Sequence, residues 1–215
     1  MGEQKLPHQP NRSIHKQLRG QDNDKLAVLN PARAMLLEAM HRYEDDFEPV
    51  SLFVANKLVF FLKALGGPFD ARVKFTRHIY GPYAPAVNHV VYHLNGSYLT
   101  GLEQNTARPF DPLRLDYERY PQIQAFVGKE LTPSQRHILL RLDELLDGYK
   151  SAYALEILAT VAFIRRDRPS ASVDEILAEA RQWSPRKAKM LRREYVEQAV
   201  ERLDAYAADM FTSWQ

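Results

Sequence analysis

Two histidines, His89 and His93, stand four residues apart in a segment of helical periodicity, which is the spacing of a metal-binding pair. The same predicted helix carries Val87, Val91 and other apolar residues on another side. Two histidines are too few ligands, and no carboxylate follows them at a motif spacing. We therefore interpret both as residues of a solvated helix face, and we expect no metal site.

Two charged residues, Lys57 and Glu156, interrupt segments that are otherwise apolar, and Asn56 stands beside the lysine. A lone buried charge costs several kcal/mol, so each of them must be paired, reach solvent or serve a function. One hypothesis is a buried Lys57–Glu156 ion pair between two central helices. The alternative is that each contacts solvent independently, and a catalytic pair is a remote third option.

The segment from 181 to 193 is basic and holds no acidic residue. Phosphate binding is one interpretation of such a run. However, acidic residues resume at Glu194, and Trp183 is the only aromatic residue within the segment. This composition favours a solvated basic face. The basic residues are Arg181, Arg186, Lys187, Lys189, Arg192 and Arg193.

The most distinctive local feature is the turn His78-Ile79-Tyr80-Gly81-Pro82-Tyr83-Ala84-Pro85. Glycine and two prolines restrict its backbone, so its aromatic rings are held rigidly at the start of a helix. Rigid aromatic side chains bury much area and lose little entropy on binding. The alternative is that the tyrosines only pack the loop onto the core. The candidate partner-binding residues are His78, Tyr80, Tyr83, Asn88 and Tyr92.

Specific catalytic motifs are missing from the 215 residues: there is no glycine-rich nucleotide loop, no nucleophile elbow and no zinc-protease signature. The chain has no cysteine and only 9 glycines, which argues against thiolate chemistry and a phosphate-binding loop. We therefore expect a protein that is not an enzyme and needs no cofactor. The net charge of +2 does not steer the chain onto nucleic acid. Its apolar runs are too short to span a bilayer, and no secretion signal is visible, so we expect a cytoplasmic protein.

Helix signals recur along most of the chain. Asn30-Pro31, Ser51, Pro85, Thr132-Pro133, Ser151, Ser172 and Ser184-Pro185 begin predicted helices, and a last one starts at Arg193. Short strands are predicted at 73–75, 97–100 and 113–115, and one small antiparallel sheet would use all three. The predicted fold is mainly α: a compact bundle of about seven helices with a small antiparallel β-sheet. Residues 1–24 are interpreted as a flexible, disordered tail, and 25–215 as one domain.

Several blocks, in order, resemble one known family. They read NPARAMLLEAM, VSLFVANKLVFFLKALGGPF and RVKFTRHIYGPYAPAVNHVVYHLNGSYLTG, followed later by SAYALEILATVAFI and QWSPRKAKML. This series is similar to the C-terminal toxin-binding domain of DarG-type antitoxins, and more distantly to Panacea-type antitoxin domains. The likeness runs from about Asn30 to about Tyr206, whereas the N-terminal macrodomain of that family has no counterpart here.

The resemblance implies an antitoxin domain of a bacterial toxin–antitoxin system. Such a domain would bind a DarT-like DNA ADP-ribosyltransferase toxin by direct protein contact and mask its DNA or NAD site. On this interpretation the partner is a protein, with no small-molecule substrate, no membrane and no expected role for nucleic acid. The alternative is a nucleic-acid-binding regulatory module that uses the basic stretch 181–193. A small hydrolase remains a third, remote option.

Overall fold

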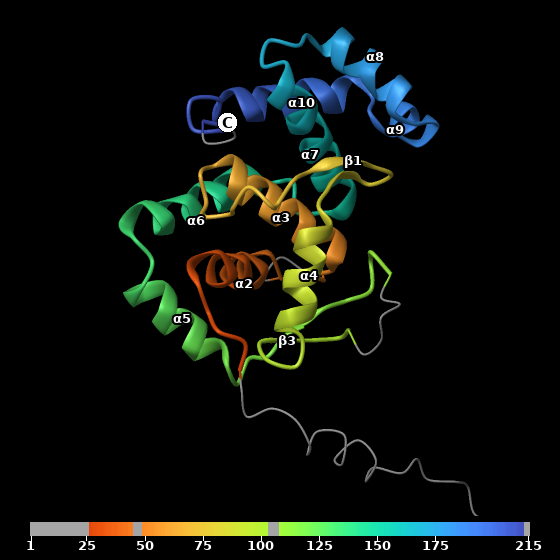
Figure 1. Cartoon of the computed structure of the whole chain (residues 1–215). Coiled ribbons are helices and arrows are strands. Elements are labelled where there is room, and N and C mark those ends of the chain that lie inside the picture. Colours follow the sequence, from red (N-terminus) through yellow and green to blue (C-terminus); the bar gives the residue numbers. More distant parts are fainter. Residues whose placement is uncertain (1–25, 45–48, 103–107, 213–215) are drawn as a thin grey trace, which may run out of the picture.

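The computed structural model describes residues 26–44, 49–102 and 108–212, so the tail expected at 1–24 lies outside the described residues. Within these ranges the chain forms nine helices and two small antiparallel sheets, which confirms the mainly helical fold class (Figure 1). The helices are α2 Pro31–Glu44, α3 Leu52–Ala64, α4 Pro85–Leu94, α5 Tyr120–Lys129, α6 Pro133–Leu146, α7 Ala152–Asp167, α8 Val173–Trp183, α9 Pro185–Met190 and α10 Arg193–Asp204.

Side-chain caps explain why several helices begin where the sequence predicts. Ser51 and Ser151 accept hydrogen bonds from backbone N–H groups in the first turns of α3 and α7. Thr132 and Ser172 form capping boxes at α6 and α8, in which the third helical residue bonds back to the cap. These bonds satisfy donors that the first turn of a helix otherwise leaves unpaired, so the helix starts are fixed locally.

Helices α3 and α7 form the centre of the molecule. Nearly every residue of α3 is buried, and ten consecutive residues of α7, Leu155–Ile164, are buried. The other helices pack around this pair: α2, α4 and α6 against α3, and α8 and α10 against α7. In Figure 1, α8, α9 and α10 lie together at one end, and α2 and α5 lie towards the other. Two central helices that are buried on nearly all sides therefore organise the core.

The strands differ from the prediction. Residues 73–75 form no strand, because the N–H groups of Val73 and Lys74 bond to nearby carbonyls in a turn. Instead β1 Thr76–His78 pairs with β2 Gly81–Tyr83, inside the proline-containing turn. The predicted segments 97–100 and 113–115 contribute β3 Leu99–Thr100 and β4 Arg114–Leu115, which form a second sheet. All three residues of β1 are exposed, so the strand has no alternation of buried and exposed side chains that a sequence could reveal. The formation of β1 therefore depends on tertiary packing.

Gly81 is required by both its backbone conformation and its surroundings. Its φ of +91° lies in a region that L side chains rarely adopt. A Cβ atom there would lie 3.1 Å from the Thr160 hydroxyl, and 3.6 Å from Lys187 Nζ and from Lys57 Cε. Strand β2 therefore passes closely between α3 and α7, and only glycine lets it do so.

We expect Gly81→Ala to lower the free energy of unfolding by about 2–3 kcal/mol, through backbone strain plus crowding. Gly66→Ala is the matched control, because Gly66 has a φ of +90° and no atom within 4 Å of the added Cβ. The control isolates the cost of the backbone angle, about 1–2 kcal/mol. Urea unfolding of both variants gives the difference, and equal losses would contradict the close packing of β2.

None of the helices in the described ranges is long and apolar enough to cross a membrane.

Candidate functional site

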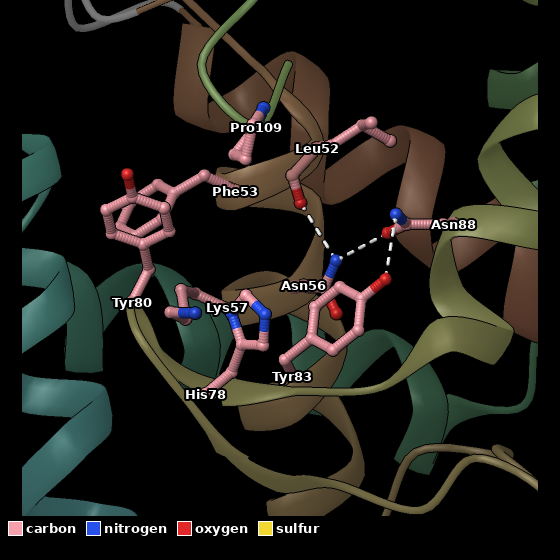
Figure 2. Close-up of a pocket in the computed structure, with 9 residues that line it drawn as sticks. All are labelled: Leu52, Phe53, Asn56, Lys57, His78, Tyr80, Tyr83, Asn88 and Pro109. Atoms are coloured by element: carbon pink, nitrogen blue, oxygen red, sulfur yellow. Dashed lines mark hydrogen bonds between the residues drawn. The ribbon is translucent and has the colours of Figure 1, made fainter. Parts of the chain in front are cut away.

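A cavity of about 120 Å³ opens where α3, the β1–β2 hairpin and α4 meet (Figure 2). Helix α3 lines it with its first two turns, the hairpin with three aromatic side chains, and α4 with an amide. The nine lining residues are Leu52, Phe53, Asn56, Lys57, His78, Tyr80, Tyr83, Asn88 and Pro109. We call this cavity the hairpin pocket.

Aromatic rings form two walls of the hairpin pocket. On one side the rings of His78 and Tyr83 lie with their centroids 4.8 Å apart at an interplanar angle of 33°. On the other, Tyr80 and Phe53 make edge contacts, and Phe110 lies 4.9 Å from each of them. Such faces accept a planar ring or a cation by stacking.

A chain of amides crosses the floor of the pocket, and the backbone fixes its direction (Figure 2). Asn56 Nδ2 donates to the carbonyl of Leu52, and Asn56 Oδ1 accepts from the N–H of Ala84. These two backbone partners show which atom of the Asn56 side-chain amide is the nitrogen and which is the oxygen. Its second Nδ2 bond, 2.9 Å, therefore goes to Asn88 Oδ1, and Asn88 Nδ2 donates to the Tyr83 hydroxyl at 3.1 Å.

It follows that the Tyr83 hydroxyl is an acceptor towards Asn88 and keeps its own hydrogen for another group. Among the described residues no acceptor for that hydrogen is found. Tyr83 lines the cavity. The chain of hydrogen bonds from the Leu52 carbonyl through Asn56 and Asn88 therefore leaves the Tyr83 hydroxyl able to donate to a group bound in the cavity.

Lys57 brings a buried ammonium group to the same pocket. The residue is 2% exposed, and its Nζ donates to the carbonyl of Pro82 at 2.9 Å. The ammonium also lies 4.7 Å from the centroid of the Phe53 ring. Burial, reinforced by the positive charge of Lys187, lowers the pKa of Lys57 to about 7. The pocket thus holds an amine that changes charge near neutral pH.

Glu156 does not form the predicted pair with Lys57. Its carboxylate accepts from Lys187 Nζ at 2.6 Å and from both terminal guanidinium nitrogens of Arg186. Lys187 is fully buried and donates also to Thr160 Oγ1 at 3.0 Å. The hypothesis of a direct Lys57–Glu156 pair is therefore wrong, as is the alternative of independent solvent contact, because both residues are 2% exposed.

Four of the five predicted binding residues lie together. His78, Tyr80, Tyr83 and Asn88 all line the hairpin pocket, whereas Tyr92 packs half-buried against the core. Whether any of them contacts a partner stays a prediction. The prediction missed the α3 side of the pocket, which supplies Asn56 and Lys57. Its signal was visible as two polar residues inside an apolar helix.

The other sequence candidates are accounted for differently. His89 and His93 are both exposed, and the described residues contain no group of three or more metal-binding side chains. The basic stretch is divided by the fold: Lys187 is buried, Arg186 binds Glu156, and Arg193 binds Asp174. Half of its six cations therefore serve contacts within the chain.

We expect the free energy of unfolding to rise between pH 7 and pH 9. Burial lowers the pKa of Lys57 to about 7 and that of Lys187 to about 8, so the unfolded chain binds more protons than the folded chain in this range. Stability then increases with pH, by at most about 1.4 kcal/mol per pH unit for each lysine. Chemical denaturation at several pH values measures the slope.

Lys57→Met should reduce this slope, because the methionine neither titrates nor carries a charge into the core. Lys74→Met is the matched control, since Lys74 is exposed and its replacement should leave the slope unchanged. A wild-type stability that is flat from pH 7 to pH 9 would contradict the lowered pKa values.

Comparison with known proteins relates this sequence to proteins named DNA ADP-ribosyl glycohydrolase. No family model matches the sequence. A protein of Thermus aquaticus named DNA ADP-ribosyl glycohydrolase is 31% identical over 160 residues, covering 74% of this chain and 43% of the relative. Proteins of the same name from Mycobacterium bovis and Mycobacterium tuberculosis are each 25% identical over 185 residues, covering 80% of this chain and 51% of the relative.

The chain is similar to DNA ADP-ribosyl glycohydrolases. It spans about half the length of the curated relatives that it matches.

These names correct several expectations. The relatives are named for an enzymatic activity on ADP-ribosylated DNA, not as toxin-binding domains of DarG-type antitoxins. The prediction of an antitoxin that neutralises a DarT-like toxin is therefore contradicted, together with the prediction that the chain is not an enzyme. The expected partners were also wrong, because the names imply a nucleic-acid substrate. The error arose because the motifs that carried the resemblance do not report activity.

Proposed function

We infer that this protein acts in the removal of ADP-ribose from DNA, and that the hairpin pocket receives part of the modified DNA. The observation that carries this inference is the combination of aromatic walls with two donors, Lys57 and Tyr83, in one cavity. The names of the relatives indicate ADP-ribosylated DNA as the class of substrate. Nucleobases stack on aromatic side chains, and phosphate oxygens accept hydrogen bonds from ammonium and hydroxyl groups, so both parts of DNA match this lining.

The size of the pocket limits what it can hold. Its volume of about 120 Å³ is well below the roughly 300–1,000 Å³ of a site for a whole small molecule. One ring or one phosphate group fits, whereas a complete ADP-ribose does not. The pocket therefore binds one group of a larger substrate, and the remainder lies outside it.

The chemistry of the lining favours binding and positioning. Hydrolysis of a glycosidic bond commonly uses a carboxylate near the scissile bond. None of the nine lining residues is acidic, and Glu156 is occupied by Lys187 and Arg186. The pKa of Lys57, about 7, makes it a group of the pocket that can transfer a proton near neutral pH.

The test is an incubation of the chain with a single-stranded oligonucleotide that carries one ADP-ribosyl group. We expect tighter binding of the modified than of the unmodified strand, and release of free ADP-ribose that chromatography detects. Tyr80→Ala should weaken the binding about tenfold, through loss of a stacking face. Tyr117→Ala is the control, because Tyr117 is 54% exposed and does not line the pocket.

Equal affinity for the modified and unmodified strands, with no release of ADP-ribose, would contradict the proposed function. Preferential binding without release would keep the substrate site and assign bond cleavage to the part of the relatives that this chain does not span.

A further inference from the structure

Positive charge exceeds negative charge around the hairpin pocket. Behind it lie the buried Lys57 and Lys187 and the partly exposed Arg186, and among the described residues Glu156 is the carboxylate that pairs with Lys187 and Arg186. Both lysines approach Gly81 of β2, since Lys57 Cε and Lys187 Nζ each lie 3.6 Å from the position of a Cβ there. Arg186 and Lys187 share the carboxylate, so Lys57 is left with a neutral carbonyl as its acceptor.

The groups that face Lys57 from the neighbouring elements do not supply the missing anion. From α7 comes Glu156, and from α9 come Arg186 and Lys187, which share its carboxylate. From the hairpin come His78, Tyr80 and Tyr83, none of which is a carboxylate. A buried ammonium without a counter-ion is costly, and the cost falls when an anion binds beside it.

The second hydrogen-bond donor in the pocket, the Tyr83 hydroxyl, also favours a bound anion. The direction of the amide relay makes the Tyr83 hydroxyl a donor towards the cavity. An ammonium and a hydroxyl that donate into one small cavity suit a group with several acceptor oxygens and a negative charge.

We propose that the hairpin pocket is an oxyanion site, which binds a phosphate group between the Lys57 ammonium and the Tyr83 hydroxyl. This proposal rests on the proposed function and deepens it, because it names the group of the substrate that enters the pocket. The phosphate can come from the diphosphate of ADP-ribose or from the DNA backbone, and both present the same oxygens.

Proton uptake follows from the buried position of Lys57. Burial and Lys187 lower its pKa to about 7, so above that pH the free amine is mostly neutral. A bound phosphate favours the ammonium and raises the pKa, which draws a proton from solvent. Binding should therefore weaken as the pH rises above about 7, by up to about tenfold per pH unit.

The experiment is titration calorimetry on the whole chain with ADP-ribose, AMP, adenosine and a short oligothymidylate as separate probes. Each titration is run at about pH 8 in two buffers of different ionisation enthalpy, which gives the number of protons taken up. We expect AMP or ADP-ribose to bind with uptake of close to one proton, and adenosine to bind at least about tenfold more weakly. The relative affinities of ADP-ribose and oligothymidylate identify the source of the phosphate.

Variants assign the proton to one residue. Lys57→Met should weaken phosphate binding by about ten- to a hundredfold and abolish the uptake. Tyr83→Phe should weaken it by about tenfold or less and keep the uptake. His78→Gln removes the imidazole that lines the pocket, and it should also keep the uptake. Lys74→Met controls for the loss of one positive charge at the surface.

Three results would overturn the proposal: equal affinity for AMP and adenosine, binding of phosphate compounds by wild-type protein without proton uptake, or no binding of any probe. The wild-type measurement needs no variant, so it stands even if Lys57→Met misfolds. Release of ADP-ribose from DNA is a separate measurement. If release occurs without phosphate binding in the pocket, the oxyanion site is wrong and the proposed function remains.

Discussion

Glu156→Gln is expected to lower the free energy of unfolding by about 3–5 kcal/mol near pH 7. The glutamine keeps the shape of the side chain but removes the carboxylate that pairs with Lys187 in the described part of the chain. Lys187 is fully buried, and its remaining partner is the Thr160 hydroxyl. Leaving a buried ammonium without a counter-charge is what makes the loss large, and urea unfolding followed by circular dichroism measures it.

Two further variants separate this ion pair from a general sensitivity of the fold. Glu156→Gln combined with Lys187→Met removes both charges and should recover more than half of the lost stability. Glu197→Gln is the surface control, because Glu197 and Arg193 are 3.6 Å apart with both side chains about half exposed. We expect that change to cost about 0.5 kcal/mol or less. A double variant no more stable than Glu156→Gln would rule out a coupled pair.

The sequence predicted the helices well because their signals are local. Ser51, Thr132, Ser151 and Ser172 act within three residues of themselves, and each begins a helix in the structure. The hairpin was missed because β1 has no buried side chain and β2 begins with Gly81-Pro82, two residues that are poor strand formers. The pairing of β1 and β2 is decided by packing against α3 and α7.

The candidate site was predicted in part for a similar reason. Its aromatic turn is continuous in the chain, so His78, Tyr80 and Tyr83 could be found from their spacing alone. The partner of Glu156 could not be found in this way, because Lys187 belongs to a run of basic residues whose composition predicts an exposed surface. Only the fold decides which cation of that run is buried, and it selects Lys187, on the same side of α9 as buried Met190. Long-range pairing of this kind leaves no periodic signal.

Phe60→Ala is expected to destabilise the protein by about 3–5 kcal/mol, comparable to the loss of Glu156. Phe60 is fully buried on α3, and its ring joins parts of the chain that are distant in sequence. The ring centroid lies 5.3 Å from that of Phe75, 6.2 Å from that of Phe163 on α7 and 6.1 Å from that of Phe211. Removing it leaves a cavity at the junction of the two central helices, which close-packed surroundings fill only in part.

Phe110→Ala is the matched control for the removal of a phenyl ring. Phe110 is 45% exposed, and its contacts are with Phe53 and Tyr80 at the rim of the hairpin pocket. Its loss should cost about 1 kcal/mol in stability, since little apolar area leaves a buried position. The rim, however, should become more open, so binding of the modified oligonucleotide should weaken while the fold persists. Losses of equal size in the two variants would contradict the central place of Phe60 in the core, because burial is what distinguishes the two rings.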